Sequence, residues 1–513
     1  MLFKNSTLQF VASFLLLFLG NLVGYSLKLD VCVVNLLVAL GCFVAFVPYG
    51  GRCVWLGCGV AIATVLLCLL GIEGKFFAVY MWVAFLGGSV WLSKDFSCRN
   101  LSFMLIFGAV FFNLNFISTT WFNWVQYDIL SCYNYIEYII DNNFMFWREN
   151  PLISRPSYSA YHPILHFFIA GLGLKSAEML SGSIEVAKET VQVLFCFYLF
   201  MFYVYANRII TLFKFDKLVH LSVLSLVCFF PIFNAMAGYF NNDGLLLALQ
   251  GASVYYALAY YMEEKKSDLW KMVTCVVLAC LTKLSGVVVL PMIGVIFLIK
   301  LWQKREWKRF CELLSAGVVI LIGVALWPLY QHFVLGVDYN YVPPQEHLAL
   351  APYSYWERFN PVKAIFYGKM FYDDFGINLW ETMTKTAIFG QWNFEVKAKD
   401  VFALVVITEF CYKFLVGVLI VGGAWLLLKK RDVKLYLIYV LMAGILLAHV
   451  MFGIMHPYMC NMDFRYVAIL ILPMAIILGF VMSELKFGFR VAITAIISAF
   501  IVSSAIVWWY IVL

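Results

Sequence analysis

Long apolar segments recur along the whole chain and are separated by short polar connections. A helix needs roughly 20 apolar residues to cross a hydrocarbon layer about 30 Å thick. Alternating strand patterns are absent from the sequence, so helices must satisfy the backbone hydrogen bonds within the lipid. The pattern predicts an all-α polytopic membrane protein with about 14 to 15 transmembrane helices. The segments are 7–27, 31–48, 53–71, 77–93, 101–118, 189–211, 219–238, 244–262, 270–283, 285–302, 312–334, 401–428, 435–454, 465–482 and 489–513.

The first long polar stretch, 119–161, ends in a short apolar piece at 162–174. This piece is too short to span the membrane, and we predict a juxtamembrane or re-entrant helix with Pro163 in its first turn. A helix that starts in this way directs its positive end outward and suits a phosphate group.

Lysine and arginine are densest in four loops, and these loops fall on one side of the membrane if the N-terminus is cytoplasmic. That orientation places Lys283 and the other chemically interesting polar positions together on the outer face. The four basic loops are 208–217, 263–271, 300–309 and 429–434, and the predicted outer segments are 119–188, 239–243, 335–400 and 455–465.

The same pattern predicts a division of the chain into four parts. Residues 1–118 form an N-terminal transmembrane scaffold of five helices, and 119–334 form a catalytic transmembrane module whose first outer loop is 119–161. Residues 335–400 form an outer loop region, and 401–513 form the C-terminal transmembrane helices.

Composition supports the membrane assignment and excludes one class of partner. The chain is 64% hydrophobic and 13% charged, with a mean hydropathy of +0.89. Its net charge of +7 arises from basic residues scattered among loops, so we expect no nucleic-acid partner. Most of the 14 cysteines lie inside apolar runs, which is typical of buried thiols. We expect a multi-pass protein of a bacterial cytoplasmic membrane, with the endoplasmic reticulum as the alternative.

The first outer loop contains candidates for acid–base chemistry and phosphate binding. Asp128 lies just beyond a span, where a carboxylate could take a proton from an acceptor hydroxyl, and Tyr135 follows it. Asp128 could instead cap a juxtamembrane helix, with the tyrosines at the lipid interface. Further along, Arg155 and His162 could donate hydrogen bonds to a phosphate.

Three later motifs place further polar groups on the predicted outer side. Asn242 and Asp243 precede Gly244 in a turn that could bind sugar or only cap a helix. Lys283 lies between two apolar helices, where an unpaired charge is costly and functional use is the default hypothesis. Arg465, followed by Tyr466, could bind a phosphate or form a local ion pair with Asp463.

Taken together and in this order, the motifs resemble the GT-C membrane glycosyltransferases of the glycosyltransferase family 39 and RgtA/B-like kind. That group includes protein O-mannosyltransferases and lipid A aminoarabinose transferases. The resemblance covers residues 119–310 best. It rests on an acidic first-loop pattern fitted by Asp128, Tyr135 and Ile136, a helix start at 162–165, the Asn-Asn-Asp turn 241–243, the segment 281–286 and the pair Arg465-Tyr466.

The resemblance implies an inverting transfer of a sugar from a polyprenyl-phosphate donor to a lipid, glycan or protein acceptor. Asp128 would be the base, and Arg155, His162, Lys283 and Arg465 would hold the leaving phosphate. Ile129, Cys132 and Ile164 replace the family's second acid, its histidine and one of its prolines. A metal shared by two carboxylates is therefore not supported, and we expect no cofactor.

Two other classes of function remain as alternatives. A secondary transporter or lipid flippase would place charged residues at mid-membrane and show related halves in the sequence. A polymerase or ligase of lipid-linked glycans would carry an outer loop rich in arginine and histidine.

Overall fold

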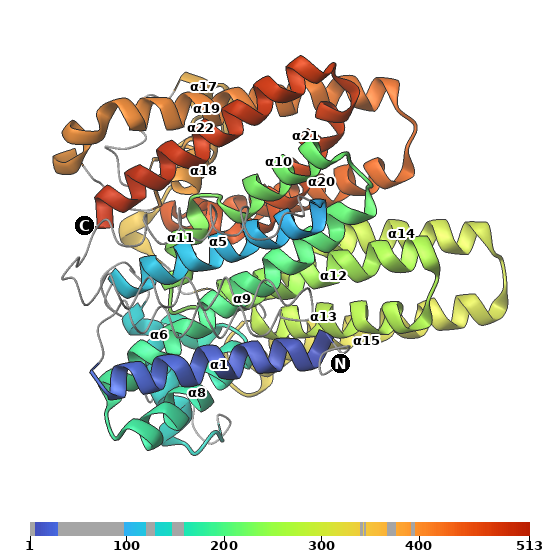
Figure 1. The fold of residues 1–513 in the computed structure, drawn as a ribbon. Helices are drawn as coiled ribbons and strands as arrows, with labels where there is room; N and C mark the ends of the chain where they lie inside the picture. The colour runs from blue at the N-terminus through green and yellow to red at the C-terminus, as the bar shows by residue number, and fades with distance from the viewer. Residues whose placement is uncertain are drawn as a thin grey trace.

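The computed structural model describes residues 6–28, 97–119, 129–145, 158–338, 342, 345–366, 376–390 and 395–512. Apart from one isolated bridge between Ala349 and Tyr458, these residues form no β structure. Long helices lie side by side with their axes in roughly one direction (Figure 1). The chain is an all-α polytopic membrane protein, as the apolar pattern predicts.

Eight helices of the described part are long and apolar enough to cross a membrane, or nine if one bent pair counts as a single span. The eight are α9 (Ile184–Leu212), α12 (Asp243–Glu263), η3 with α14 (Leu284–Gln303), α15 (Trp307–Phe333), the Val401–Lys429 part of α19 (Glu395–Lys429), α20 (Val433–Met455), η5, η6 and α21 together (Met459–Glu484), and α22 (Phe487–Val512). The bent pair, with an angle of 45°, is α10 (Lys217–Cys228) and α11 (Ile232–Gly238).

Two N-terminal helices, α1 (Ser6–Ser26) and α5 (Cys98–Thr119), match the predicted spans 7–27 and 101–118 and pack against α9. Between them, the predicted spans 31–48, 53–71 and 77–93 lie outside the described residues. The total of 14 to 15 transmembrane helices and the division into four parts therefore stay predictions.

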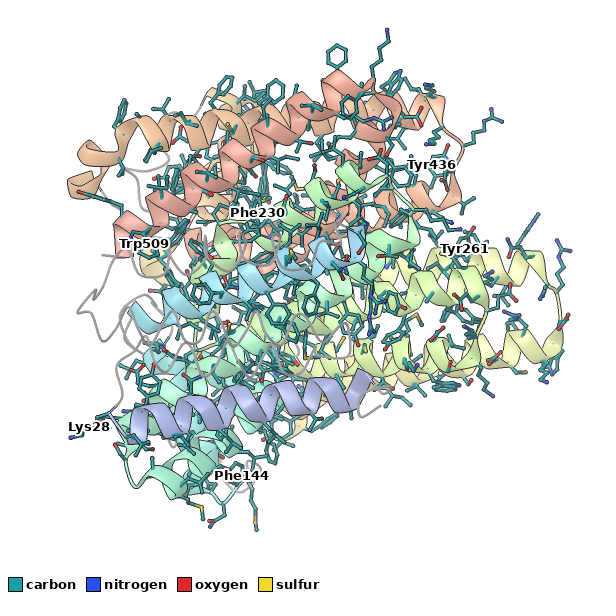
Figure 2. The ribbon with its side chains drawn as sticks, viewed as in Figure 1. Lys28, Phe144, Phe230, Tyr261, Tyr436 and Trp509 are labelled. Atoms are coloured by element: carbon teal, nitrogen blue, oxygen red, sulfur yellow. The ribbon has the colours of Figure 1, made fainter. Side chains whose placement is uncertain are left out.

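The connections separate into two groups at opposite ends of the bundle. The four basic loops lie toward the right in Figure 1, and in Figure 2 Tyr261 and Tyr436 mark this end. Lys28, Phe144 and Trp509 lie at the other end. Lys300 of one basic loop forms an ion pair with Glu264 of another, and Arg490 near the start of α22 forms one with Asp216. The grouping expected from the basic residues is thus present in the fold.

The short apolar segment 162–174 belongs to α8 (Leu165–Ser181), which is not among the candidate spans. It packs with α6 (Ile129–Asp141) and with α9, at the end away from the basic loops (Figure 1). One detail differs from the sequence-based expectation. The helix begins at Leu165, so Pro163 precedes it rather than lying in its first turn. The turn at 162–164 is not helical, so His162 precedes α8 and does not belong to any face of that helix.

Candidate functional site

Lys283 lies where the chain breaks between two helices. α13 (Lys266–Thr282) ends at Lys283, whose backbone is extended, and the chain continues as η3 (Leu284–Val289) before α14 (Leu290–Gln303). Gly286 makes this tight return possible. A Cβ at that position would lie 2.7 Å from backbone atoms of Ala279 and Cys280. The glycine of the 281–286 segment therefore lets the backbone fold onto the end of α13 and direct Lys283 toward α12.

At the break after α13, two backbone carbonyls have no regular helical partner. They accept hydrogen bonds from Asn242, which precedes α12, and from Gln250 within α12. The amide nitrogen of Asn242 donates to the carbonyl of Thr282 at 3.1 Å, and that of Gln250 donates to Ser285 at 3.0 Å. Such bonds are needed because a buried carbonyl without a donor is costly. Asn242 thus positions the break that carries Lys283.

Asp243 is the first residue of α12 and is almost fully buried. Its backbone N–H donates to the side-chain oxygen of Asn241 at 3.0 Å. Its Oδ1 accepts a hydrogen bond from Nζ of Lys283 at 2.5 Å. Two motifs that the sequence places 40 residues apart therefore form one buried ion pair.

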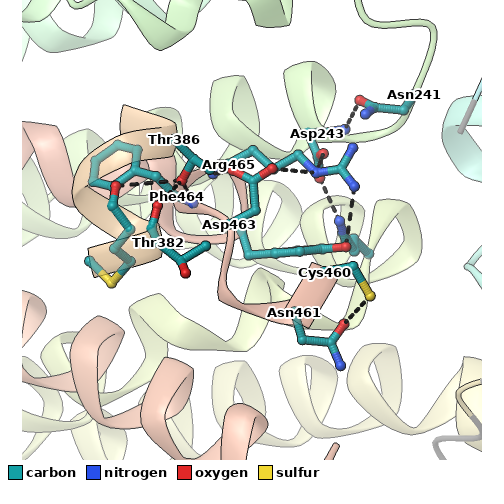
Figure 3. Close-up of polar contacts among 12 residues, drawn as sticks. Asn241, Asp243, Thr382, Thr386, Cys460, Asn461, Asp463, Phe464 and Arg465 are labelled. Carbon is teal, nitrogen blue, oxygen red and sulfur yellow. Dashed lines mark hydrogen bonds and ion pairs between the residues drawn. The ribbon is translucent and has the colours of Figure 1, made fainter. Parts of the chain in front are cut away.

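Arg465 joins this pair from a third part of the chain. It lies in η6 (Phe464–Leu470), and Asp463 caps that helix by accepting from the backbone N–H of Arg465 at 2.9 Å. Nε of Arg465 lies 3.5 Å from Oδ2 of Asp463 and 4.0 Å from Oδ2 of Asp243 (Figure 3). Two carboxylates and two cations thus form one buried cluster, which we call the Asp243–Arg465 cluster.

The helix that presents Arg465 is anchored to the segment that precedes α19. The backbone N–H of Phe464 donates to Oγ1 of Thr386 at 2.8 Å, and Thr386 belongs to α18 (Leu379–Phe389) (Figure 3). The fully buried Asn378 caps the start of α18 by accepting from the backbone N–H of Trp380. Residues 376–390 are therefore part of the structure that holds the cluster.

Two tyrosine rings line the cations of the cluster. Nζ of Lys283 lies 4.4 Å from the ring centre of Tyr466, and the guanidinium of Arg465 lies 5.1 Å from it. The ring of Tyr239 is 5.9 Å from the same guanidinium. Aromatic faces attract cations, so these rings stabilise the two charges in their buried position.

His162 approaches the cluster from the α6–α8 side. The preceding carbonyl, of Tyr161, accepts from the indole N–H of Trp327 at 2.8 Å and from the amide of Gln331 at 3.1 Å, so α15 fixes this turn. Burial holds the pKa of His162 well below its usual range, and the nearby charges of Lys283 and Arg465 lower it further. This shift favours the neutral imidazole, which can donate or accept a hydrogen bond.

The structure brings together His162, Asn242, Asp243, Lys283, Arg465 and Tyr466 of the residues selected from the sequence. Tyr135 is buried in α6, where its ring packs against those of Phe167 and Tyr138. Asp128 and Arg155 lie outside the described residues.

Other members of the site were not selected from the sequence. Asp463 had a signal, its position two residues before Arg465, but a local ion pair explained it equally well. Tyr239 had a weaker signal, its place beside the Asn-Asn-Asp turn. Thr386 had none, because only tertiary packing brings α18 against η6.

Within the described residues, no group of three or more histidine, cysteine, aspartate or glutamate side chains could hold a metal ion. No protein-family model matches the chain, and no curated protein matches it significantly.

Proposed function

We propose that this protein is a membrane glycosyltransferase that moves a sugar from a polyprenyl-phosphate carrier to an acceptor hydroxyl. The observation that carries the proposal is the Asp243–Arg465 cluster, in which Lys283 and Arg465 lie buried close to one shared carboxylate. Cations held in a place shielded from water are suited to stabilise the negative charge of a leaving phosphate. Asp243 and Lys283 lie at the ends of α12 and α13 opposite the basic loop 263–271, which agrees with a lipid-linked donor used on the outer face.

In the proposed reaction, the acceptor oxygen forms a bond to the anomeric carbon while the bond from that carbon to the phosphate oxygen breaks. The electron pair of the broken bond stays on the polyprenyl phosphate, whose charge Lys283 and Arg465 stabilise. His162 donates one hydrogen bond, and Tyr466 and Tyr239 offer their faces to the sugar. Asp128 takes the acceptor proton, as the family resemblance implies.

The test is transfer by the full-length protein in proteoliposomes, from a panel of polyprenyl-phosphate sugars. Lys283→Met and Arg465→Met should each lower the rate at least about a hundredfold, the size expected for loss of one group that stabilises developing charge. Asp128→Asn should abolish transfer, and full activity in that variant would remove Asp128 from the mechanism. Inactivity of the wild type with every carrier would overturn the proposal.

One observation favours a second candidate, a secondary transporter. Spans are interrupted at the cluster, at Lys283 and again at Val467, and discontinuous helices with buried charges surround the substrate site in many transporters. Solute uptake into the same vesicles, without sugar transfer, would favour this alternative. A glycan polymerase or ligase would be distinguished by repeated extension of a lipid-linked glycan.

A further inference from the structure

Three cations surround one carboxylate at the basic end of the α14–α15 hairpin. The carboxylate belongs to Glu264, which ends α12 in a left-handed backbone conformation. Its Oε1 accepts from Lys300 at 2.8 Å, and its Oε2 accepts from both Lys304 at 3.0 Å and Arg309 at 2.7 Å. Because Lys304 and Arg309 share one oxygen, two positive charges are held close together with a single negative charge between them.

This arrangement keeps an excess of positive charge at neutral pH. Hydrogen bonds from Lys300, Arg309 and Lys304 lower the pKa of Glu264 to about 2, so the carboxylate is ionised at neutral pH. The two loops that meet here, 263–271 and 300–312, carry eight lysine and arginine residues against five carboxylates. At the other basic loops fewer cations share one carboxylate: Glu484 pairs with two lysines, and Asp216 pairs with one arginine.

Exposed aromatic residues flank these cations. Trp302 and Trp307 are each 77% exposed, and the guanidinium of Arg305 lies 5.1 Å from the ring centre of Trp302. Tryptophan is typical of the level where lipid tails meet headgroups. Farther along the same two helices, Leu298 and Leu314 are also exposed, as expected of a surface that faces lipid tails. The cations therefore lie where lipid headgroups would be.

We propose that Lys304, Arg305, Lys308 and Arg309, which we call the hairpin basic cluster, bind the phosphodiester headgroup of an anionic phospholipid. Lys304 and Arg309 are held in place by Glu264, whereas Arg305 and Lys308 lie on the exposed side of the hairpin. The flanking tryptophans and apolar helix faces accommodate a lipid rather than free phosphate. This site lies at the opposite end of the bundle from the Asp243–Arg465 cluster and does not depend on the proposed sugar transfer.

The test uses full-length protein in mixed micelles of phosphatidylglycerol and phosphatidylcholine, with bound lipids counted by native mass spectrometry. The wild type should retain phosphatidylglycerol preferentially. Lys304→Gln, Arg305→Gln and Lys308→Gln together should weaken that retention at least about tenfold, since each cation near an anionic lipid surface contributes about fivefold. Lys300 and Arg309 stay in place in this variant, so Glu264 keeps two of its partners.

A matched control removes three charges from another basic loop, through Lys429→Gln, Lys430→Gln and Lys434→Gln. It should retain phosphatidylglycerol as the wild type does, and an equal loss in the control would show a general charge effect and overturn the site. Added inorganic phosphate should not displace the lipid, and displacement would show that the cluster recognises any phosphate. Equal retention of both lipids by the wild type would also overturn the proposal.

Discussion

Nζ of Lys283 lies 2.5 Å from Oδ1 of Asp243, and both side chains are buried. Lys283 ends α13 and Asp243 begins α12, so the pair ties the break in one span to the start of its neighbour. The same carboxylate faces Arg465, which makes Asp243 the shared partner of both cations.

Removing one partner of this pair should cost more than removing both. Asp243→Asn leaves the ammonium of Lys283 without a full counter-charge, and loss of one partner of a buried ion pair typically costs about 3–5 kcal/mol. Asp243→Asn combined with Lys283→Met should be less destabilised than Asp243→Asn alone. Unfolding in mixed micelles measures the free energies of the wild type, of Asp243→Asn and Lys283→Met alone, and of the double variant. Additive losses in the double variant would mean that the two residues do not stabilise each other.

Gly286→Ala should destabilise the protein by about 1–3 kcal/mol, the usual cost of forcing extra volume into a packed site. The new methyl group would meet backbone atoms of Ala279 and Cys280, which cannot move aside as a side chain can. The shift should also displace Lys283 and lower any transfer activity. Gly294→Ala is the matched control, because a Cβ there meets no atom within 4 Å. Alanine favours the helix over glycine, so this control should be neutral or more stable than the wild type.

Gln250→Met should cost about 1–3 kcal/mol in the free energy of unfolding, because the carbonyl of Ser285 would lose its donor inside the bundle. The comparison is Gln192→Met, another buried glutamine. The side-chain oxygen of Gln192 has no hydrogen-bond partner among the described residues, so this change should be neutral or stabilising. Equal losses in the two variants would show that methionine is simply unsuited to the interior.

His166 should make the protein sensitive to acid. It is fully buried in α8, both ring nitrogens lack a hydrogen-bond partner among the described residues, and burial lowers its pKa to about 3. Below its ordinary pKa of about 6.5, His166 is protonated in the unfolded chain. In the folded protein it stays neutral until the pH approaches about 3. Stability is therefore present above that range and falls as pH drops through it, by about 2 kcal/mol between pH 7 and pH 5.

His166→Phe tests this explanation, because its neighbours Phe167, Phe195 and Tyr198 already form an aromatic environment. The variant should lose about 2 kcal/mol less than the wild type over the same pH range. Thermal unfolding at a series of pH values provides the measurement. Parallel pH profiles would exclude His166 as the source of the acid sensitivity.

Much of the fold follows from local properties of the chain, namely the length and position of its apolar segments. Helix boundaries at 184–212, 243–263 and 433–455 agree with the apolar segments within a few residues. The pattern succeeds here because lipid penalises every unpaired backbone group, which leaves helices as the solution for each long apolar run. It is less informative at 217–238 and 459–484, where apolar runs contain breaks that hydropathy does not register.

The candidate site was only partly predictable. The motifs containing Asp243, Lys283 and Arg465 could be selected because polar groups beside apolar helices are costly. Their pairing could not be derived, because each residue had an equally simple local explanation. The ion pair expected between Asp463 and Arg465 is present. Arg465 also faces Asp243, so a local ion pair does not exclude a place for Arg465 in the cluster.

Apolar length and charge placement act locally, so they are enough to predict that this chain crosses a membrane repeatedly and that its basic loops gather at one end. Which polar residues meet depends on tertiary packing. Breaks at Lys283 and near Val467, the close approach permitted by Gly286, and the anchoring of η6 by Thr386 bring segments more than 200 residues apart into one buried cluster. Such contacts depend on packing among distant helices, and no local pattern in the sequence specifies them.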